Sequence, residues 1–362
     1  MTTVYIEQKD APVHLPYSLV FWPNFRFPLP SKRLFLKEVM EQYQMPFFAL
    51  SSRPEEADFF AVPFEYFFVQ KEHPAYLARV FAAAAAAGKK VLLFDYTDYV
   101  DWIPKVPSHA ILFRVSAYRH HRRHTDIVMP YFVEDMGIRY GMAPKAKSRE
   151  PVIGYCGQSL FGSPAKAFRA RLKQLVYAFR LLLSGDTDSA SHQRGIFWRK
   201  AALRVLRTGG FPSRIIERPF YALHSFSNAF DPTAVRNEYV QNLRECELAL
   251  CVRGDANASQ RLYEALSARR VPLLVDTDCV LPLEEVVDYD AALLRTPARE
   301  LATLPTRVRS WWERETSESF LARGAHARDI YERYLRLDRF FARVFDRAQS
   351  PYRQLLFGRE SV

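Results

Sequence analysis

The chain has 362 residues, and because a single hydrophobic core stops growing at about 250–300 residues, we expect two domains. With 49% hydrophobic residues, 28 Phe and 19 Tyr, the composition excludes an intrinsically disordered protein. The net charge of +11, from 51 basic and 40 acidic residues, favours an anionic partner: nucleic acid, an anionic membrane surface or a phosphate-bearing small molecule.

No segment of the sequence has the length and apolarity of a transmembrane helix, and residues 1–10 lack the order of a signal peptide. The four cysteines, Cys156, Cys246, Cys251 and Cys279, form no CxxC pair. We therefore expect a cytoplasmic protein with free, buried thiols and no structural zinc site.

The first half of the chain alternates short apolar runs with helical patterns. Strands are predicted at 17–22, 46–51, 58–64, 90–94, 109–115 and 126–133. Helices are predicted from Ser31 to about Tyr43 and from about Pro74 to Ala87, where Gly88 follows. Continuously apolar strands separated by helices indicate a parallel sheet that is covered on both faces.

Residues 141–151 are polar, basic and proline-containing, without periodicity, and are predicted to be an interdomain linker. Beyond them the alternation resumes, with strands predicted at 152–157, 214–217, 247–252, 271–275 and 291–294. The expected fold is therefore α/β, with two Rossmann-like, doubly wound domains and a C-terminal helical tail. The expected bounds are 1–145, 150–325 and 326–362.

One predicted helix of the second half begins at Ser163-Pro164, an N-cap residue followed by a proline. We expect it to end before Gly185. Its large apolar residues recur at helical spacing and form one stripe: Phe168, Leu172, Leu175, Val176, Phe179, Leu182 and Leu183.

The most informative segment is 246–282, which is predicted to form a strand, a turn, a helix and a second strand. The turn begins with Arg253-Gly254. Asn257 is in position to cap the helix, with Gln260 three residues later as in a capping box. Ser259 lies in the first turn.

Arg261 and Glu264 are three residues apart and share a face of this predicted helix. The carboxyl end of a strand followed by a helix N-terminus is where α/β sheets bind ligands and where phosphate is attracted. Arg253 is expected to contact a diphosphate, and Glu264 to accept both hydroxyls of a ribose, without a divalent metal. The alternative is that Arg261 and Glu264 form a surface ion pair and that Arg253 caps a carbonyl.

This segment resembles the core motif of the exostosin-type glycosyltransferase family, in which an RG turn precedes S-x-R-x-x-E-A and a Pro-containing strand. The matching positions are Arg253-Gly254, Ser259, Arg261, Glu264-Ala265, Val271-Pro272-Leu273, Leu281-Pro282-Leu283-Glu284-Glu285 and Asp288-Tyr289. Upstream, residues 57–64 and 126–130 are similar to two further strands of the family. The similarities occur in the family's order and together span most of the chain.

The resemblance implies a GT-B fold and inversion at the anomeric carbon. It also implies a nucleotide-sugar donor, usually UDP-linked, held in the C-terminal domain by Arg253, Gly254, Asn257, Ser259, Arg261 and Glu264. The N-terminal domain would then bind a glycan or glycolipid acceptor. Two departures are the Ala268-Arg269-Arg270 segment, where the family usually has glycine, and the lack of an anchor and stem. The second implies a cytoplasmic, bacterial enzyme of surface polysaccharide synthesis; peripheral association with the inner face of the membrane remains open.

An inverting transfer needs a base that removes the proton of the acceptor hydroxyl. Asp95 and Asp98 follow the predicted strand at 90–94, and Glu65 follows the strand before it. Each would face the interdomain cleft from the carboxyl edge of the sheet. We rank Asp95 first, then Asp98, then Glu65; the alternative is that each only forms a turn or caps a helix.

The basic run Arg119, His120 and His121 also lies near a strand end, where it would bind an acidic acceptor or a phosphate. A solvated basic loop is the alternative. A metal site is not expected here, because adjacent histidines rarely converge on one ion.

Two other functions remain open from the sequence: a GT-B enzyme that uses a GDP-sugar, and a basic nucleic-acid-binding protein. The second would need basic and aromatic residues on one groove, whereas the aromatic residues here lie mainly in apolar strands. We therefore expect no nucleic-acid partner and no cofactor apart from the donor substrate. The sequence does not indicate an oligomeric state.

Overall fold

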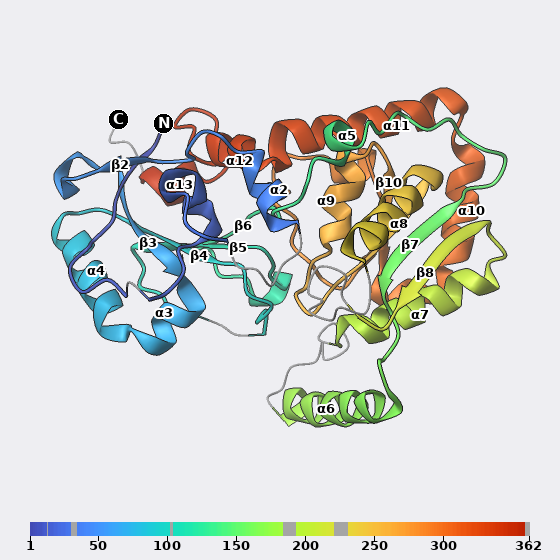
Figure 1. Ribbon diagram of the computed structural model, residues 1–362, viewed down its shortest axis with the longest axis horizontal. Helices are drawn as coiled ribbons and strands as arrows, with labels where there is room; N and C mark the ends of the chain where they lie inside the picture. Colours follow the sequence, from blue (N-terminus) through green and yellow to red (C-terminus); the bar gives the residue numbers. More distant parts are fainter. Residues whose placement is uncertain (13, 30–34, 102–103, 184–192, 221–230, 359–362) are drawn as a thin grey trace.

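The computed structural model describes the chain except residues 13, 30–34, 102–103, 184–192, 221–230 and 359–362. Within the described part, two parallel sheets lie side by side, one built from each half of the chain (Figure 1). The first has six strands in the order β2-β1-β3-β4-β5-β6, and the second has five in the order β11-β10-β9-β7-β8. The predicted fold class, two Rossmann-like α/β units, is confirmed.

The first sheet comprises β1 (Thr3–Tyr5), β2 (Ala49–Ser51), β3 (Phe59–Glu65), β4 (Val91–Asp95), β5 (Ala110–Arg114) and β6 (Asp126–Val128). The helices of this half are η1 (Leu19–Phe21), α1 (Trp22–Phe25), α2 (Leu36–Glu41), η2 (Pro54–Glu56), α3 (Tyr66–Glu72), α4 (Pro74–Ala86), η3 (Arg119–His121) and α5 (Met136–Arg139). Every residue of β3, β4 and β5 is buried, which explains their continuously apolar sequences.

The strand predicted at 17–22 is wrong, because these residues begin the 3-10 helix η1 and the short helix α1 instead. Pro23 occupies the first turn of α1, where its missing N–H is tolerated. A short, wholly apolar run has the same pattern in a buried helix as in a buried strand, so periodicity alone could not separate them. The helix expected from Ser31 is described only from Leu36, since Ser31 itself lies outside the described residues.

The second sheet comprises β7 (Ile153–Gln158), β8 (Ser213–Arg218), β9 (Leu248–Val252), β10 (Val271–Asp276) and β11 (Leu294–Pro297). Its helices are α6 (Pro164–Leu183), α7 (Gly195–Thr208), α8 (Pro232–Glu245), α9 (Gln260–Ser267), η5 (Tyr289–Ala291) and η6 (Ala298–Thr303). The two sheets fall on either side of residues 141–151, which form no helix or strand. The four cysteines are buried and free.

The C-terminal segment runs back along one edge of the molecule to the first sheet (Figure 1). It consists of α10 (Leu304–Arg314), α11 (Ser317–Ile330), η7 (Tyr331–Leu335), α12 (Leu337–Val344) and α13 (Arg353–Phe357). In α12, Phe341 packs on Phe47, Phe48 and Phe113, with ring centroids 5.3–5.8 Å apart. The tail therefore completes the core of the half from which the chain started.

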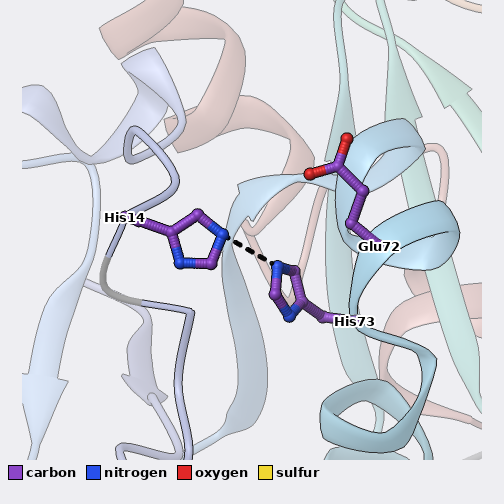
Figure 2. Close-up of side chains that lie close together, drawn as sticks. All are labelled: His14, Glu72 and His73. Atoms are coloured by element: carbon purple, nitrogen blue, oxygen red, sulfur yellow. Dashed lines mark hydrogen bonds between the residues drawn. The ribbon is translucent and has the colours of Figure 1, made fainter.

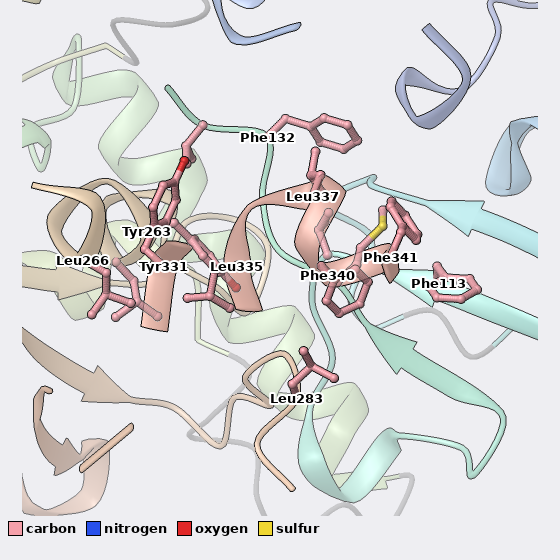
Figure 3. Close-up of a cluster of buried hydrophobic side chains, with 14 of the residues drawn as sticks. Phe113, Phe132, Tyr263, Leu266, Leu283, Tyr331, Leu335, Leu337, Phe340 and Phe341 are labelled. Atoms are coloured by element: carbon pink, nitrogen blue, oxygen red, sulfur yellow. The ribbon is translucent and has the colours of Figure 1, made fainter. Parts of the chain in front are cut away.

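One hydrophobic cluster extends through both halves and fixes their relative position. It joins Phe113 and Phe132 of the first half, Tyr263 and Leu266 of α9, and Phe340 of the tail (Figure 3). Separate clusters fill the opposite faces of the two sheets.

The described helices include none that is long and apolar enough to cross a bilayer.

Candidate functional site

A pocket of about 560 Å³ opens between the carboxyl ends of the two sheets. From the second sheet it is lined by Gln158, the last residue of β7, and by Val252, the last residue of β9. From the first half it is lined by Tyr96 and Asp98, which follow β4. Its volume falls within the range of small-molecule sites, roughly 300–1,000 Å³, and its place is the ligand-binding edge of open α/β sheets.

The turn between β9 and α9 forms part of the pocket wall, but not in the predicted way. Helix α9 starts at Gln260, so Ser259 occupies the N-cap position and no capping box forms. The Asn257 amide is fully buried instead, donating to the carbonyls of Ala117 (3.3 Å) and Thr277 (3.2 Å). Asn257 therefore links the turn to the first half of the chain and does not line the pocket; its predicted donor contact is not supported. Gly254 and Ser259 do line it.

Arg261 lies in the pocket wall with an incomplete set of partners. Its Nη2 donates to Oδ1 of Asn242 at 2.6 Å, and its guanidinium lies 5.0 Å from the ring centroid of Tyr239. The Nε and Nη1 atoms are buried and have no hydrogen-bond partner among the described residues. An unsatisfied buried donor is costly, so these two N–H groups are the strongest indication of a ligand in this pocket.

Glu264 also lines the pocket and is buried, 4% exposed. It accepts hydrogen bonds from the Tyr239 hydroxyl and from Nη1 of Arg236 at 3.4 Å, so the predicted alternative of an Arg261–Glu264 surface pair is wrong. Burial raises the pKa of Tyr239 well above its usual value, and the charge of Glu264 raises it further. The tyrosine therefore stays protonated and donates to a carboxylate that faces the pocket.

Arg253 is placed differently from its predicted role at a diphosphate. It is buried, 3% exposed, and donates to the Tyr118 hydroxyl and to the Asp255 carbonyl at 2.7 Å. It does not line the pocket. In this arrangement Arg253 joins the RG turn to the first half of the chain, and the predicted phosphate contact is not supported.

Three arginines that were not predicted from the sequence line the pocket: Arg199, Arg218 and Arg236. Arg199 of α7 donates to the carbonyls of Arg253 and Gln158, both at 3.0 Å. Arg218 is the last residue of β8, where it pairs with Glu238 of α8. Arg218 could have been predicted from its position at the end of a strand. Arg199 lies within a helix, and its sequence context gave no indication of a place in the pocket.

The three candidate bases are not equivalent. Asp98 is exposed and lines the pocket. Asp95 is 2% exposed, accepts from the backbone N–H (3.0 Å) and hydroxyl (2.7 Å) of Thr97, and pairs with Arg114. Glu65 is 9% exposed and accepts from the backbone N–H of Tyr96. The ranking of Asp95 first is therefore not supported by its placement, because a base must reach the acceptor.

Glu65 and Asp95 form a buried carboxyl pair behind the pocket. Burial raises the pKa of Glu65 well above its usual value, and the charge of Asp95 raises it further. Neither residue lines the pocket. Their contacts with Tyr96 and Thr97 instead hold the loop that carries Asp98.

The predicted acceptor residues Arg119, His120 and His121 form η3, which packs against the second half. Arg119 binds both carboxylate oxygens of Glu284, at 2.6 and 3.0 Å, and His120 Nδ1 lies 2.5 Å from Asp278. None of the three lines the pocket. Arg119 and His120 instead meet loops of the second half, and the predicted acceptor contact remains a prediction.

Among the described residues, one group of three potential metal ligands lies close together: His14, Glu72 and His73. Figure 2 shows the two imidazoles joined by a hydrogen bond, with Nε2 atoms 3.1 Å apart, and the Glu72 carboxylate beside them. The group is at the end of α3 and contributes nothing to the pocket.

Three comparisons relate this chain to known proteins. Residues 220–311 match the model of the Exostosin GT47 domain. The Exostosin-1 homolog of Caenorhabditis elegans is 29% identical over 101 residues, which are 28% of this chain and 25% of that protein. The crystal structure of Anabaena HepE in complex with UDP resembles this one with a TM-score of 0.39 and 13% identity, over 94% of this chain and 98% of that one. The family match confirms the motif resemblance, and the matched segment includes Arg261 and Glu264.

Proposed function

We propose that this chain is an inverting glycosyltransferase that takes a nucleotide-sugar donor, UDP-linked, and transfers the sugar to a glycan or glycolipid acceptor in surface polysaccharide synthesis. The observation that carries the proposal is the pocket itself. Arg261 and Glu264, which lie in the segment that matches the GT47 model, line it from the second half of the chain, and Asp98 lines it from the first half.

The donor would bind against the second sheet. Each oxygen of Glu264 accepts one hydrogen bond within the protein and keeps lone pairs for the two hydroxyls of a ribose. Two nitrogens of Arg261, Nε and Nη1, have no hydrogen-bond partner among the described residues, and Arg199 and Arg218 add positive charge on the same wall. This combination suits a nucleoside diphosphate, because a buried carboxylate discriminates for ribose and arginine forks suit phosphate.

The transfer would be a direct displacement between the sheets. The acceptor oxygen forms a bond to the anomeric carbon, and the bond from that carbon to the diphosphate oxygen breaks. Asp98 would take the acceptor proton, and Arg199, Arg218 and Arg261 would stabilise the charge on the departing diphosphate. One displacement inverts the anomeric centre.

We propose that the transfer needs no divalent metal, since three arginines provide the positive charge that a metal would otherwise supply. Activity should then persist after dialysis against EDTA. Loss of turnover in EDTA, restored by manganese, would contradict this part of the proposal and leave the donor site in place.

The experiment that tests the function is nucleotide binding by calorimetry, with UDP and GDP compared, followed by a panel of nucleotide-sugars. Glu264→Gln should weaken nucleotide binding by about 10–100-fold, the worth of hydrogen bonds to a charged group. Glu247→Gln is a matched control, because Glu247 is equally buried in the same half and lies outside the pocket. Unchanged nucleotide affinity in Glu264→Gln would refute the ribose role, and tighter binding of GDP than UDP would favour a GDP-sugar donor.

A further inference from the structure

Helix α6 lies apart from both sheets and extends from the body of the second half (Figure 1). The seven residues of its apolar stripe are 46–72% exposed: Phe168, Leu172, Leu175, Val176, Phe179, Leu182 and Leu183. By contrast, α7 buries the apolar side chains of its own stripe, including Trp198, Leu203 and Leu206. A contiguous apolar surface of this kind marks an interaction site in a folded protein.

The helix presents this stripe away from the protein. At 3.6 residues per turn, the seven residues fall within an arc of about 120°. The side chains turned to the body lie on a different arc: Ala170 is buried, and Gln174, Tyr177 and Ala178 are half-buried. Within the described part of the chain, the body of the protein therefore leaves the apolar face uncovered.

The polar residues of α6 carry one sign of charge. The helix contains Lys166, Arg169, Arg171, Lys173 and Arg180 and no acidic residue. Four of them cluster next to one edge of the apolar arc, and Arg171 lies next to the other edge. A helix with an apolar face bordered by basic residues is typical of helices that lie in the interface of an anionic bilayer.

We propose that α6 docks this protein on an anionic lipid membrane, with its apolar face among the acyl chains and its lysines and arginines among the headgroup phosphates. Charge complementarity selects this partner. A second copy of α6 would bring basic edges together, and a nucleic acid would leave seven apolar side chains in water.

The position of α6 connects the docking surface to the pocket. Lys166, Arg169 and Lys173 line a second cavity, of about 280 Å³, which shares Gln158 and Asp255 with the larger pocket. A docked α6 would thus hold the pocket close to the headgroups. This placement favours an acceptor that is linked to a lipid, an inference that rests on the proposed transfer.

The test is co-sedimentation of the full chain with vesicles of phosphatidylcholine alone and of phosphatidylcholine mixed with phosphatidylglycerol. The protein should bind the mixed vesicles and not the neutral ones. Leu175→Ser combined with Phe179→Ser should weaken this binding by at least about ten-fold, because both side chains would leave the acyl region. Ile138→Ser is the matched control, since Ile138 is as exposed as Leu175 and lies in α5.

The charge contribution is tested separately by neutralising Arg169, Lys173 and Arg180 to glutamine. Binding to the mixed vesicles should fall about five-fold for each residue, with Arg299→Gln, on the exposed η6, as the control. The proposal would be overturned if the wild-type protein did not bind the mixed vesicles, or if the serine variant bound them as well as the wild type. The proposal would also be overturned if the protein did not bind vesicles but formed a dimer in solution, and if the serine substitutions converted that dimer to monomers. Nucleotide affinity, measured on the serine variant, should not change, so a failure of the docking proposal is distinguishable from a failure of the transferase proposal.

Discussion

Among the acidic residues that line the pocket, Glu264 and Asp98 have different environments. Glu264 is buried and held by Tyr239 and Arg236, as expected for a group that must stay in place. Asp98 is exposed on the loop after β4. The position of Glu264 suits a fixed hydrogen-bond acceptor for ribose, and the position of Asp98 suits an accessible acceptor for a proton.

Asp98→Asn should lower turnover by roughly 10²–10⁴-fold, because the acceptor proton would lose its base. Nucleotide affinity should hardly change, since the donor contacts belong to the other half. Steady-state kinetics and calorimetry on the same variant check both statements. Asp290→Asn, which changes an exposed aspartate elsewhere, is the control. If Asp98→Asn remains active and a folded Asp95→Asn is inactive, the base assignment returns to Asp95.

Glu65→Gln should change the pH dependence of stability. The pKa of Glu65 is raised above its ordinary value of 4.5, so its contribution to stability is full below that value and is lost as pH rises through the folded pKa. Glutamine mimics the protonated form at every pH. The stability of the variant should therefore fall less with rising pH than the stability of the native protein. Urea unfolding between about pH 5 and pH 8 measures it. An equal fall in the free energy of unfolding with pH, in the native protein and in the variant, would contradict this prediction. Glu313→Gln, which changes an exposed glutamate, is the control.

At the scale of elements, the RG turn is positioned by the start of α7. Gly195, the first residue of α7, lies so close to the turn that a Cβ there would overlap the carbonyl oxygens of Arg253 and Gly254. Arg199, one turn later, donates to the Arg253 carbonyl and lines the pocket. The pocket wall therefore depends on how closely α7 approaches this turn.

Gly195→Ala should push the turn away from α7 and weaken nucleotide binding by about ten-fold or more, with a loss of stability of roughly 1–3 kcal/mol from overpacking. Gly162→Ala is the matched control, because a Cβ there would make contacts no closer than 3.7 Å. Calorimetry and urea unfolding provide the two measurements. Normal nucleotide binding in Gly195→Ala would show that the turn is not part of the donor site.

At the scale of the molecule, buried ion pairs join the residues that follow β6 to helices of the second half. Glu134 pairs with Arg236 of α8, and Asp135 pairs with Arg328 of α11. The pairs at η3, such as Arg119 with Glu284, are partly exposed. Because water screens exposed charges, the two kinds of pair should differ in their effect on stability.

Arg328→Met should destabilise the protein by about 3–5 kcal/mol, since it leaves Asp135 buried without its bidentate partner. Arg119→Met should cost less than about 1 kcal/mol. Denaturant unfolding of both variants compares them directly. Equal effects would show that the buried pair does not hold the sheets together.

The amino-acid sequence by itself determined the buried central strands and the family motif. The strands β3, β4, β5, β9 and β10 could be predicted because full burial leaves a continuous apolar run, and this signal is local. The motif placed Arg261 and Glu264 on one helix by an equally local signal, because residues three apart share a face.

Only the tertiary structure decided which polar groups meet in the pocket. Asp95 and Asp98 are three residues apart, yet one closes the end of β4 and the other faces the cavity. Arg199 and Arg218 reach the pocket from α7 and β8, and Arg253 turns away from it to Tyr118. The α6 stripe shows the same limit, because helical spacing reveals an apolar face without revealing what covers it. Local patterns specify which groups lie on one face, whereas long-range packing specifies what that face meets.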